Sequence, residues 1–335
     1  MNKPFLLSPA GKDYLWGGDR LKVNYGKNIE LTPLAETWEC STHPDGHSIV
    51  RSGEFKGDPL ASVLIRHPEY IGTHPDISGL PAGSLPIMVK LIDASADLSV
   101  QVHPDDDYAY EHEDGSRGKT EMWYVLDSAP KARLIYGLKW SSDKDQIRKA
   151  VDEGRLSDLL QEIPVHANDV FYVRAGTIHA IGAGTVVAEI QESSNITYRL
   201  YDYDRTDKNG KKRSLHMDKA LDVADLEAAP APRQPMRVLR YSPGVARELL
   251  GRCKYFEVYR MLIGTEDGKS VPYRADELSF RVLLCYEGSG EIRYTSDTDG
   301  KRQILAVKKG DCIFIPADSV KMNLTGQMQL LDIQG

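Results

Sequence analysis

The sequence lacks the features that mark membrane-spanning, secreted and cysteine-rich proteins. No apolar run is long enough to span a membrane, and residues 1–9 contain no basic stretch followed by an apolar segment. Four scattered cysteines without a C-x-x-C pair argue against a cysteine-based zinc site and against a disulfide scaffold. These absences predict a cytoplasmic protein that does not bind membranes.

An excess of positive charge is also missing. The net charge is −7, with 42 Lys and Arg against 49 Asp and Glu, which disfavours nucleic acid or an anionic membrane as a partner. A small anionic substrate stays possible, because a few Lys and Arg side chains are enough to make a local positive pocket. The length of 335 residues allows one large domain or two to three smaller ones.

Short runs of β-branched and aromatic residues, separated by Gly, Pro, Asn and Asp, make up much of the chain. Many short strands at close spacing are typical of a β-sandwich or barrel. The expected strands are Leu98–Val102, Glu121–Leu126, Ala132–Tyr136, Asp169–Val173, Thr185–Ile190, Ile196–Tyr201, Arg281–Cys285 and Cys312–Ile315.

Helical patterns are fewer. The apolar stripe of Asp143–Ile163 predicts a helix that Gly154 divides in two. Shorter helices are expected at Pro59–Arg66 and Met217–Asp222, and the Ala- and Pro-rich segment Leu226–Pro235 is typical of a linker.

A weak internal repeat indicates two lobes. Residues 168–176 resemble residues 310–317, each with a polar turn, a strand and a turn of small residues. The first copy continues to His179, whereas Val320 follows the second, and residues 240–335 contain no histidine. If both lobes are barrels, only the first is equipped to hold a metal.

Three residues far apart in sequence make the first lobe a candidate metal centre. His103 ends a strand, Glu121 begins an apolar and aromatic strand, and His179 lies at a turn after another strand. A lone buried carboxylate is costly unless it meets a cation. Two His and one carboxylate suit Zn²⁺, although Fe²⁺, Mn²⁺ or Co²⁺ are alternatives.

Strand alternation adds two polar side chains to this wall. In residues 98–104, Ser99 and Gln101 point to the same side as His103, while two valines point to the other. Such a face is unusual for a core strand and is expected in a polar pocket inside a barrel. The Gln101 amide oxygen is therefore a possible fourth ligand.

Several longer motifs carry a family resemblance over most of the first 205 residues. They are residues 16–18 (WGG), 36–39 (ETWE), 85–94 (LPIMVKLIDA), 98–106 (LSVQVHPDD), 118–121 (GKTE), 176–182 (GTIHAIG), 191–194 (QESS) and 198–202 (YRLYD). Together they resemble the type I mannose-6-phosphate isomerases, most closely the short bacterial form, within the cupin superfamily.

The resemblance implies a mainly β fold of two cupin-like jelly-roll barrels with a small helical part. We expect a catalytic, metal-binding domain with a helical insertion at residues 1–235 and a second, metal-free domain at residues 236–335. The implied activity is interconversion of mannose 6-phosphate and fructose 6-phosphate through a metal-stabilised enediolate, with one Zn²⁺ per chain. One departure is Arg174, where cupins usually have Pro.

The family's site residues fall on identifiable positions of this sequence. The implied ligands are His103, Glu121, His179 and Gln101; the implied catalytic residues are Arg199, Glu189 and Lys119; and the expected substrate-binding residues are Ser99, Lys90 and Trp16. For Arg199 the alternatives are enediolate stabilisation, phosphate binding or a place on the surface. For Trp16 a packing role is equally compatible with the sequence.

Glu189 is the candidate general base, because an aldose–ketose isomerase must move a proton between C1 and C2. It follows Val186 and Ala188 in an apolar strand, which predicts a raised pKa. A salt bridge on the barrel wall is the alternative, with His103 or a metal-bound water as the competing proton carrier.

Two other functions stay open at this point. A cupin-type Fe²⁺ oxygenase requires open coordination positions and an apolar pocket, which the expected inward Lys and Arg oppose. A non-catalytic sugar-phosphate-binding cupin would lack the isomerase activity.

Overall fold

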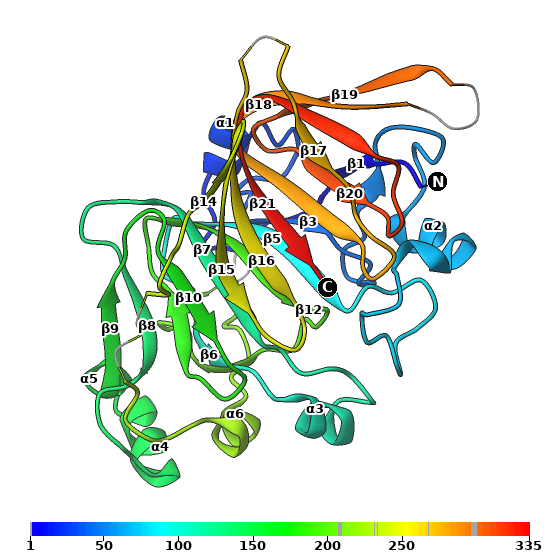
Figure 1. Cartoon of the computed structure of the whole chain (residues 1–335). Coiled ribbons are helices and arrows are strands. Elements are labelled where there is room, and N and C mark those ends of the chain that lie inside the picture. Colours follow the sequence, from blue (N-terminus) through cyan, green and yellow to red (C-terminus); the bar gives the residue numbers. More distant parts are fainter. Residues whose placement is uncertain (1, 207–209, 231, 233, 267, 296–299) are drawn as a thin grey trace.

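The computed structural model describes residues 2–206, 210–230, 232, 234–266, 268–295 and 300–335. The chain is mainly β, with its strands in three sheets and short helices at the periphery (Figure 1). The two cupin-like barrels predicted from the sequence are confirmed.

The first lobe consists of a six-stranded and a five-stranded antiparallel sheet. The strand order of the first is β10 (Val170–Val173), β7 (Glu121–Ser128), β12 (Thr185–Glu192), β5 (Ile87–Ala94), β3 (Glu36–Cys40) and β2 (Ala10–Lys12). The order of the second is β13 (Tyr198–Tyr201), β6 (Val100–Val102), β11 (His179–Ile181), β8 (Arg133–Leu138) and β9 (Leu160–Pro164).

The ten-stranded sheet forms the second lobe; its strands β14 to β21 are drawn from yellow to red in Figure 1, and β1 is drawn in blue. Its order is β14 (Arg240–Ser242), β15 (Val245–Arg252), β16 (Glu257–Gly264), β21 (Met322–Gln334), β18 (Arg281–Thr295), β20 (Cys312–Ile315), β1 (Phe5–Ser8) and β4 (Ile49–Val50). Two further strands, β17 (Val271–Tyr273) and β19 (Arg302–Lys308), pair with β21 and β18. Because β1 and β4 join this sheet, it contains strands from both ends of the chain.

The helices are short and occupy the surface. They are α1 (Arg20–Tyr25), α2 (Leu60–Arg66), α3 (Asp106–His112), α4 (Lys144–Asp152), α5 (Leu156–Leu159) and α6 (Met217–Val223), with a 3-10 turn at Pro68–Tyr70. The predicted helices near residues 59–66 and 217–222 are confirmed. The predicted linker at residues 226–235 includes residues 231 and 233, which lie outside the described part of the chain.

The predicted helix at residues 143–163 is confirmed at its start and wrong at its end. Asp143 and Gln146 form a capping box that begins α4, and Gly154 at φ +66° separates α4 from α5. Residues 160–163 form strand β9 instead of a helix, because Leu160 and Ile163 pair with β8. Pairing with a distant strand overrides the local apolar pattern.

Alternation along β5 explains how the lobes fit together. Val89 and Leu91 point into a core shared with Val282 and Leu331 of the ten-stranded sheet. Side chains at the intervening positions, such as Lys90, point to the interior of the first lobe. The second lobe therefore covers the outer face of the six-stranded sheet, and the inner face is left for a polar site. No helix in the described residues has the length and apolar character needed to cross a membrane.

Candidate active site

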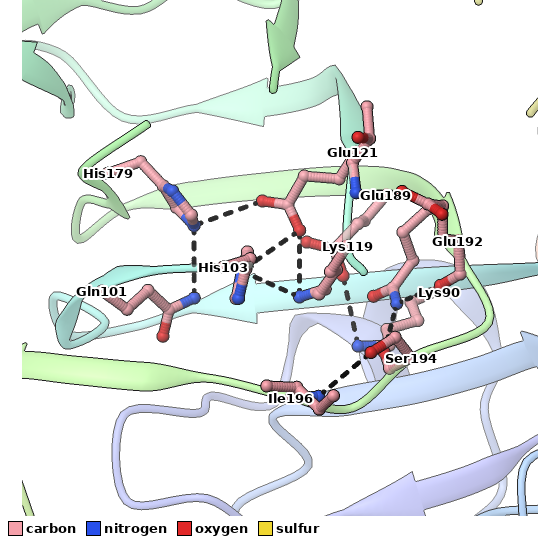
Figure 2. Close-up of polar contacts among 12 residues, drawn as sticks. Lys90, Gln101, His103, Lys119, Glu121, His179, Glu189, Glu192, Ser194 and Ile196 are labelled. Carbon is pink, nitrogen blue, oxygen red and sulfur yellow. Dashed lines mark hydrogen bonds and ion pairs between the residues drawn. The ribbon is translucent and has the colours of Figure 1, made fainter. Parts of the chain in front are cut away.

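His103, Glu121 and His179 converge between the two sheets of the first lobe. His103 directly follows β6, Glu121 begins β7 and His179 begins β11, and each side chain is at most 1% exposed. One ligand atom from each residue lies within 4.8 Å of the others. Figure 2 shows both imidazoles directed at the Glu121 carboxylate.

The separations match those of ligands around one metal ion. His179 Nε2 lies 3.3 Å from Glu121 Oε1, and His103 Nε2 lies 3.6 Å from Glu121 Oε2. Ligands bonded at about 2.0–2.2 Å in a tetrahedron lie about 3.4 Å apart. His179 Nδ1 donates to Thr177 O at 2.8 Å, so its Nε2 carries a lone pair toward Glu121 Oε1. A cation between these two acceptor atoms resolves their repulsion.

Gln101 completes the cluster on β6. Its Nε2 lies 3.4 Å from His179 Nε2, and its Oε1 accepts from Ser99 Oγ at 3.2 Å. Rotating the amide by 180° exchanges the two atoms and brings Oε1 to the position beside His179. Ser99 Oγ then accepts from the amide nitrogen, so Gln101 fits as a fourth oxygen ligand.

Burial sets the protonation states of the cluster. It lowers the pKa of His179 to about 4 and that of His103 well below the ordinary value, so both imidazoles are neutral and able to ligate at neutral pH. Burial and the nearby Glu189 carboxylate raise the pKa of Glu121 to about 7. Within the described residues no other group of His, Cys, Asp and Glu has metal-binding geometry.

Two buried lysines lie beside the cluster. Lys119 Nζ is 2.9 Å from Glu121 Oε2 and 3.2 Å from His103 Nε2. Lys90 Nζ is 3.2 Å from Glu189 Oε1, and the Glu189 Oε2 atom accepts from Trp123 Nε1 at 3.0 Å. The interior therefore alternates acidic and basic groups instead of holding an apolar pocket.

The expected raised pKa of Glu189 is wrong. Burial alone raises the pKa of this carboxyl, but Lys119 and Lys90 lower it more strongly, to about 2. The sequence neighbours of Glu189 are apolar, whereas the groups that face it across the sheet are cationic. Glu189 is therefore ionised at neutral pH, and the salt bridge considered from sequence is present.

A cavity of about 220 Å³ opens next to the cluster. Of the residues predicted from sequence, Trp16, Lys90, Ser99, Gln101, Lys119, Glu189 and Arg199 all line it. Arg199 Nε donates to Ser99 Oγ at 3.2 Å, which connects the arginine to Gln101 through one hydroxyl. Trp16 is 3% exposed and packs against Tyr14, so it has both the lining and the packing role.

Some lining residues were missed by the sequence reasoning. Glu36 lies on β3, accepts from Trp38 Nε1 at 2.8 Å and faces Lys90 at 3.8 Å. Tyr14 and Arg213 come from segments outside the strands. The strand pattern around Glu36 could have identified it as a lining residue. Arg213 follows two lysines and resembles a solvated basic turn, so its sequence neighbours carry no such signal.

Comparison of the sequence with known proteins identifies its family. Residues 5–125 match the model described as phosphomannose isomerase type I, catalytic domain. A mannose-6-phosphate isomerase of Streptococcus mutans is 36% identical over 333 residues, which is 99% of this chain and 98% of the relative. The chain belongs to the type I phosphomannose isomerase family.

Solved structures agree with membership in the type I phosphomannose isomerase family. The mannose 6-phosphate isomerase of Bacillus subtilis matches with a TM-score of 0.86 at 33% identity, over 99% of each chain. A probable mannose-6-phosphate isomerase of the same organism, GmuF, is 45% identical over 67% of this chain and 69% of its own length. A phosphomannose isomerase of Salmonella typhimurium, at 17% identity and a TM-score of 0.72, shares the fold.

Proposed function

We propose that this chain is a zinc-dependent isomerase that interconverts D-mannose 6-phosphate and D-fructose 6-phosphate by proton transfer through an enediolate. The observation that carries the proposal is the convergence of His103, Glu121 and His179 beside a polar cavity that Lys119 and Glu189 line. Family membership supports the substrate class. An isomerisation moves a proton without net oxidation, so a redox-inactive ion such as Zn²⁺ is sufficient.

The ligand set has the chemistry for such an ion. His103, Glu121 and His179 would hold it, with the Gln101 amide oxygen as the fourth ligand. When bound, the metal supplies Lewis acidity that polarises the sugar's carbonyl oxygen. Lys119, between Glu121 and His103, adds a positive charge for the oxygen on which negative charge develops.

Glu189 is our proposed base. It is ionised at neutral pH and lies in the cavity wall, so it is in the form that takes a proton from the substrate. Lys90 and Trp123 hold its two oxygens and thereby orient the carboxylate. His103 is a weaker candidate, because its Nε2 is directed at Glu121 in the metal cluster. Glu189→Gln is expected to lower kcat by about 10²- to 10⁴-fold, with substrate affinity retained.

Arg199 is our proposed stabiliser of the enediolate, together with Ser99. The guanidinium reaches the cavity from β13, and its Nη1 donates to Ser214 O at 3.0 Å. The Ser99 hydroxyl lies between it and Gln101, where it can donate to a sugar oxygen. Trp16 and Lys90 complete the proposed substrate contacts.

The division into a catalytic domain at residues 1–235 and a metal-free domain at residues 236–335 remains our proposal, as does a cytoplasmic location. Burial of Val282 and Leu331 against the six-stranded sheet supports a structural role for the second lobe.

A coupled assay tests the proposed function. Conversion of mannose 6-phosphate to fructose 6-phosphate is measured beside glucose 6-phosphate and other aldose phosphates, with zinc content and oxygen uptake recorded. Chelation is expected to abolish turnover and added Zn²⁺ to restore it, whereas His103→Ala stays inactive.

His166→Ala is the matched control, because His166 is a histidine with a side chain 79% exposed, outside the cavity lining. Full activity in a metal-free preparation would refute the metal requirement. Oxygen consumption without isomerisation would favour the oxygenase, and binding without turnover would favour the non-catalytic cupin.

A further inference from the structure

Contacts along the cavity wall order its polar groups from one end to the other. His179 in the metal cluster contacts Gln101, Gln101 contacts Ser99, and Ser99 contacts Arg199. Arg199 in turn donates to the carbonyl of Ser214, in the segment that carries Arg213. The cavity therefore has a metal end and an arginine end.

The positive charge at the arginine end is not neutralised by the protein. Arg199 has hydrogen bonds to a hydroxyl and a carbonyl, and across the described ranges no carboxylate lies within ion-pair distance of it. Arg213 and Arg205 both pair with the single carboxylate of Asp202. Arg199 and Arg213 are the two guanidiniums that line this end, and only Arg213 is paired with a carboxylate, so the lining of this end is positively charged.

Arg213 is held in place before any ligand binds. Its Nε donates to Asp202 Oδ2 at 2.7 Å and its Nη2 to Asp202 Oδ1 at 2.5 Å, a two-bond pairing with a carboxylate that is 5% exposed. Three residues on, His216 N donates to Arg199 O at 2.8 Å and its Nδ1 accepts from Arg199 N at 3.2 Å. These bonds fix residues 213–216 over β13, with the Arg213 side chain at the cavity wall.

We propose that Arg213 is the residue that binds and recognises the phosphate group of the substrate, with Asp202 as its positioning residue. The inference rests on the proposed function. Isomerisation takes place at C1 and C2, so these carbons lie at the metal end, and the group on C6 extends to the other end of the cavity. A phosphate monoester carries about −1.5 to −2 at neutral pH, so the positively charged arginine end attracts it. The orientation places the phosphate beside Arg213 and selects phosphorylated sugars.

Binding and turnover are measured together for the unmutated protein, Arg213→Gln, Arg213→Lys and Lys212→Gln. Calorimetry with fructose 6-phosphate and with inorganic phosphate gives two dissociation constants, and the coupled assay gives KM and kcat for mannose 6-phosphate. Lys212 is the matched control, because it is adjacent and cationic but is exposed, pairs with Asp204 and does not line the cavity. Thermal unfolding of each variant reports its folding.

Loss of charge-assisted hydrogen bonds predicts that Arg213→Gln weakens both probes and raises KM by about 10- to 100-fold, with kcat within about threefold. Arg213→Lys is expected to recover part of the affinity, since it keeps the charge but not the two-bond pairing. Lys212→Gln is expected to match the unmutated protein.

Unchanged affinity of Arg213→Gln for both probes would overturn the inference, as would an equal loss in Lys212→Gln. It would also be overturned if the unmutated protein bound neither probe. Binding of fructose 6-phosphate without isomerisation would refute the proposed function alone, and the dissociation constants would still decide the role of Arg213.

Discussion

Replacing Lys90 by Met tests how the buried charges of the site stabilise one another. Lys90 Nζ lies 3.2 Å from Glu189 Oε1, and both side chains are only 4% exposed. Met keeps most of the apolar stem but removes the charge, together with the contact of Nζ with the Trp38 ring, 5.0 Å from its centroid. The substitution therefore leaves a buried carboxylate without one of its two lysines.

The expected loss in the free energy of unfolding depends on which groups still stabilise Glu189 in the variant. Removing one partner of a buried ion pair costs about 3–5 kcal/mol. Lys119 and the Trp123 Nε1 donor still support Glu189 in the variant, which places the expected loss at the low end, about 3 kcal/mol at pH 7. Lys144→Met is the control, because Lys144 pairs with Asp222 on the surface, where solvent screens the pair and its loss is expected to change stability little.

The pH dependence has a definite sign. The pKa of Glu189 is lowered in the folded protein, so its contribution to stability is present above the unfolded pKa near 4.5 and is lost as the pH falls toward 2. Lys90→Met raises this pKa, so the stability difference from the unmutated protein is largest at neutral pH. The difference shrinks as the pH falls through the raised folded pKa of Glu189 in the variant toward 2. The acid limb of the kcat/KM profile is expected to move to higher pH if ionised Glu189 is the base.

Urea unfolding at about pH 7, 5 and 3 measures these differences in the free energy of unfolding. A loss below about 1 kcal/mol at pH 7 would refute the reasoning, since it would mean that the pair is screened as on the surface. A difference that stays constant from pH 7 to pH 3 would also refute it.

Three other substitutions address the remaining parts of the site. Glu121→Gln is expected to prevent stoichiometric zinc binding after dialysis, measured by metal analysis, and Glu162→Gln at an exposed position is the control. Retention of one zinc per chain in Glu121→Gln would contradict the ligand role. Ser99→Ala removes the hydroxyl between Gln101 and Arg199 and is expected to lower kcat/KM by about 5- to 15-fold without a change in Tm; unaltered kinetics would argue against the contact. Burial and Asp106 raise the pKa of Glu192 to about 8, so the stability of the folded protein falls as the pH rises from about 4.5 to 8. Glu192→Gln is expected to reduce the corresponding fall in Tm. An identical pH dependence of Tm in the variant would exclude Glu192 as its source.

Much of the fold was predictable because its signals are local. Alternating and apolar runs marked the strands, an apolar stripe and Gly154 marked α4, and the absence of histidine after residue 240 confined the predicted metal to one lobe. The tail of the helix at residues 160–163 was mistaken, because its conformation depends on pairing with β8, more than twenty residues earlier in the chain. The joining of β1 to β20 likewise has no local signal.

By itself, the sequence determined which residues can ligate and, through the resemblance, where to look for them. His103, Glu121 and His179 are separated by 18 and 58 residues, so only the antiparallel pairing of β6 with β11, and the packing of the two sheets, brings their side chains within reach of one ion. Tertiary structure also decided the charge state of Glu189. Burial raises its pKa, as its apolar neighbours in β12 suggest, but Lys119 and Lys90 from other parts of the chain lower it more strongly. The place of Arg213 was decided in the same way, because electrostatic interactions depend on distance in space and are silent in a linear pattern.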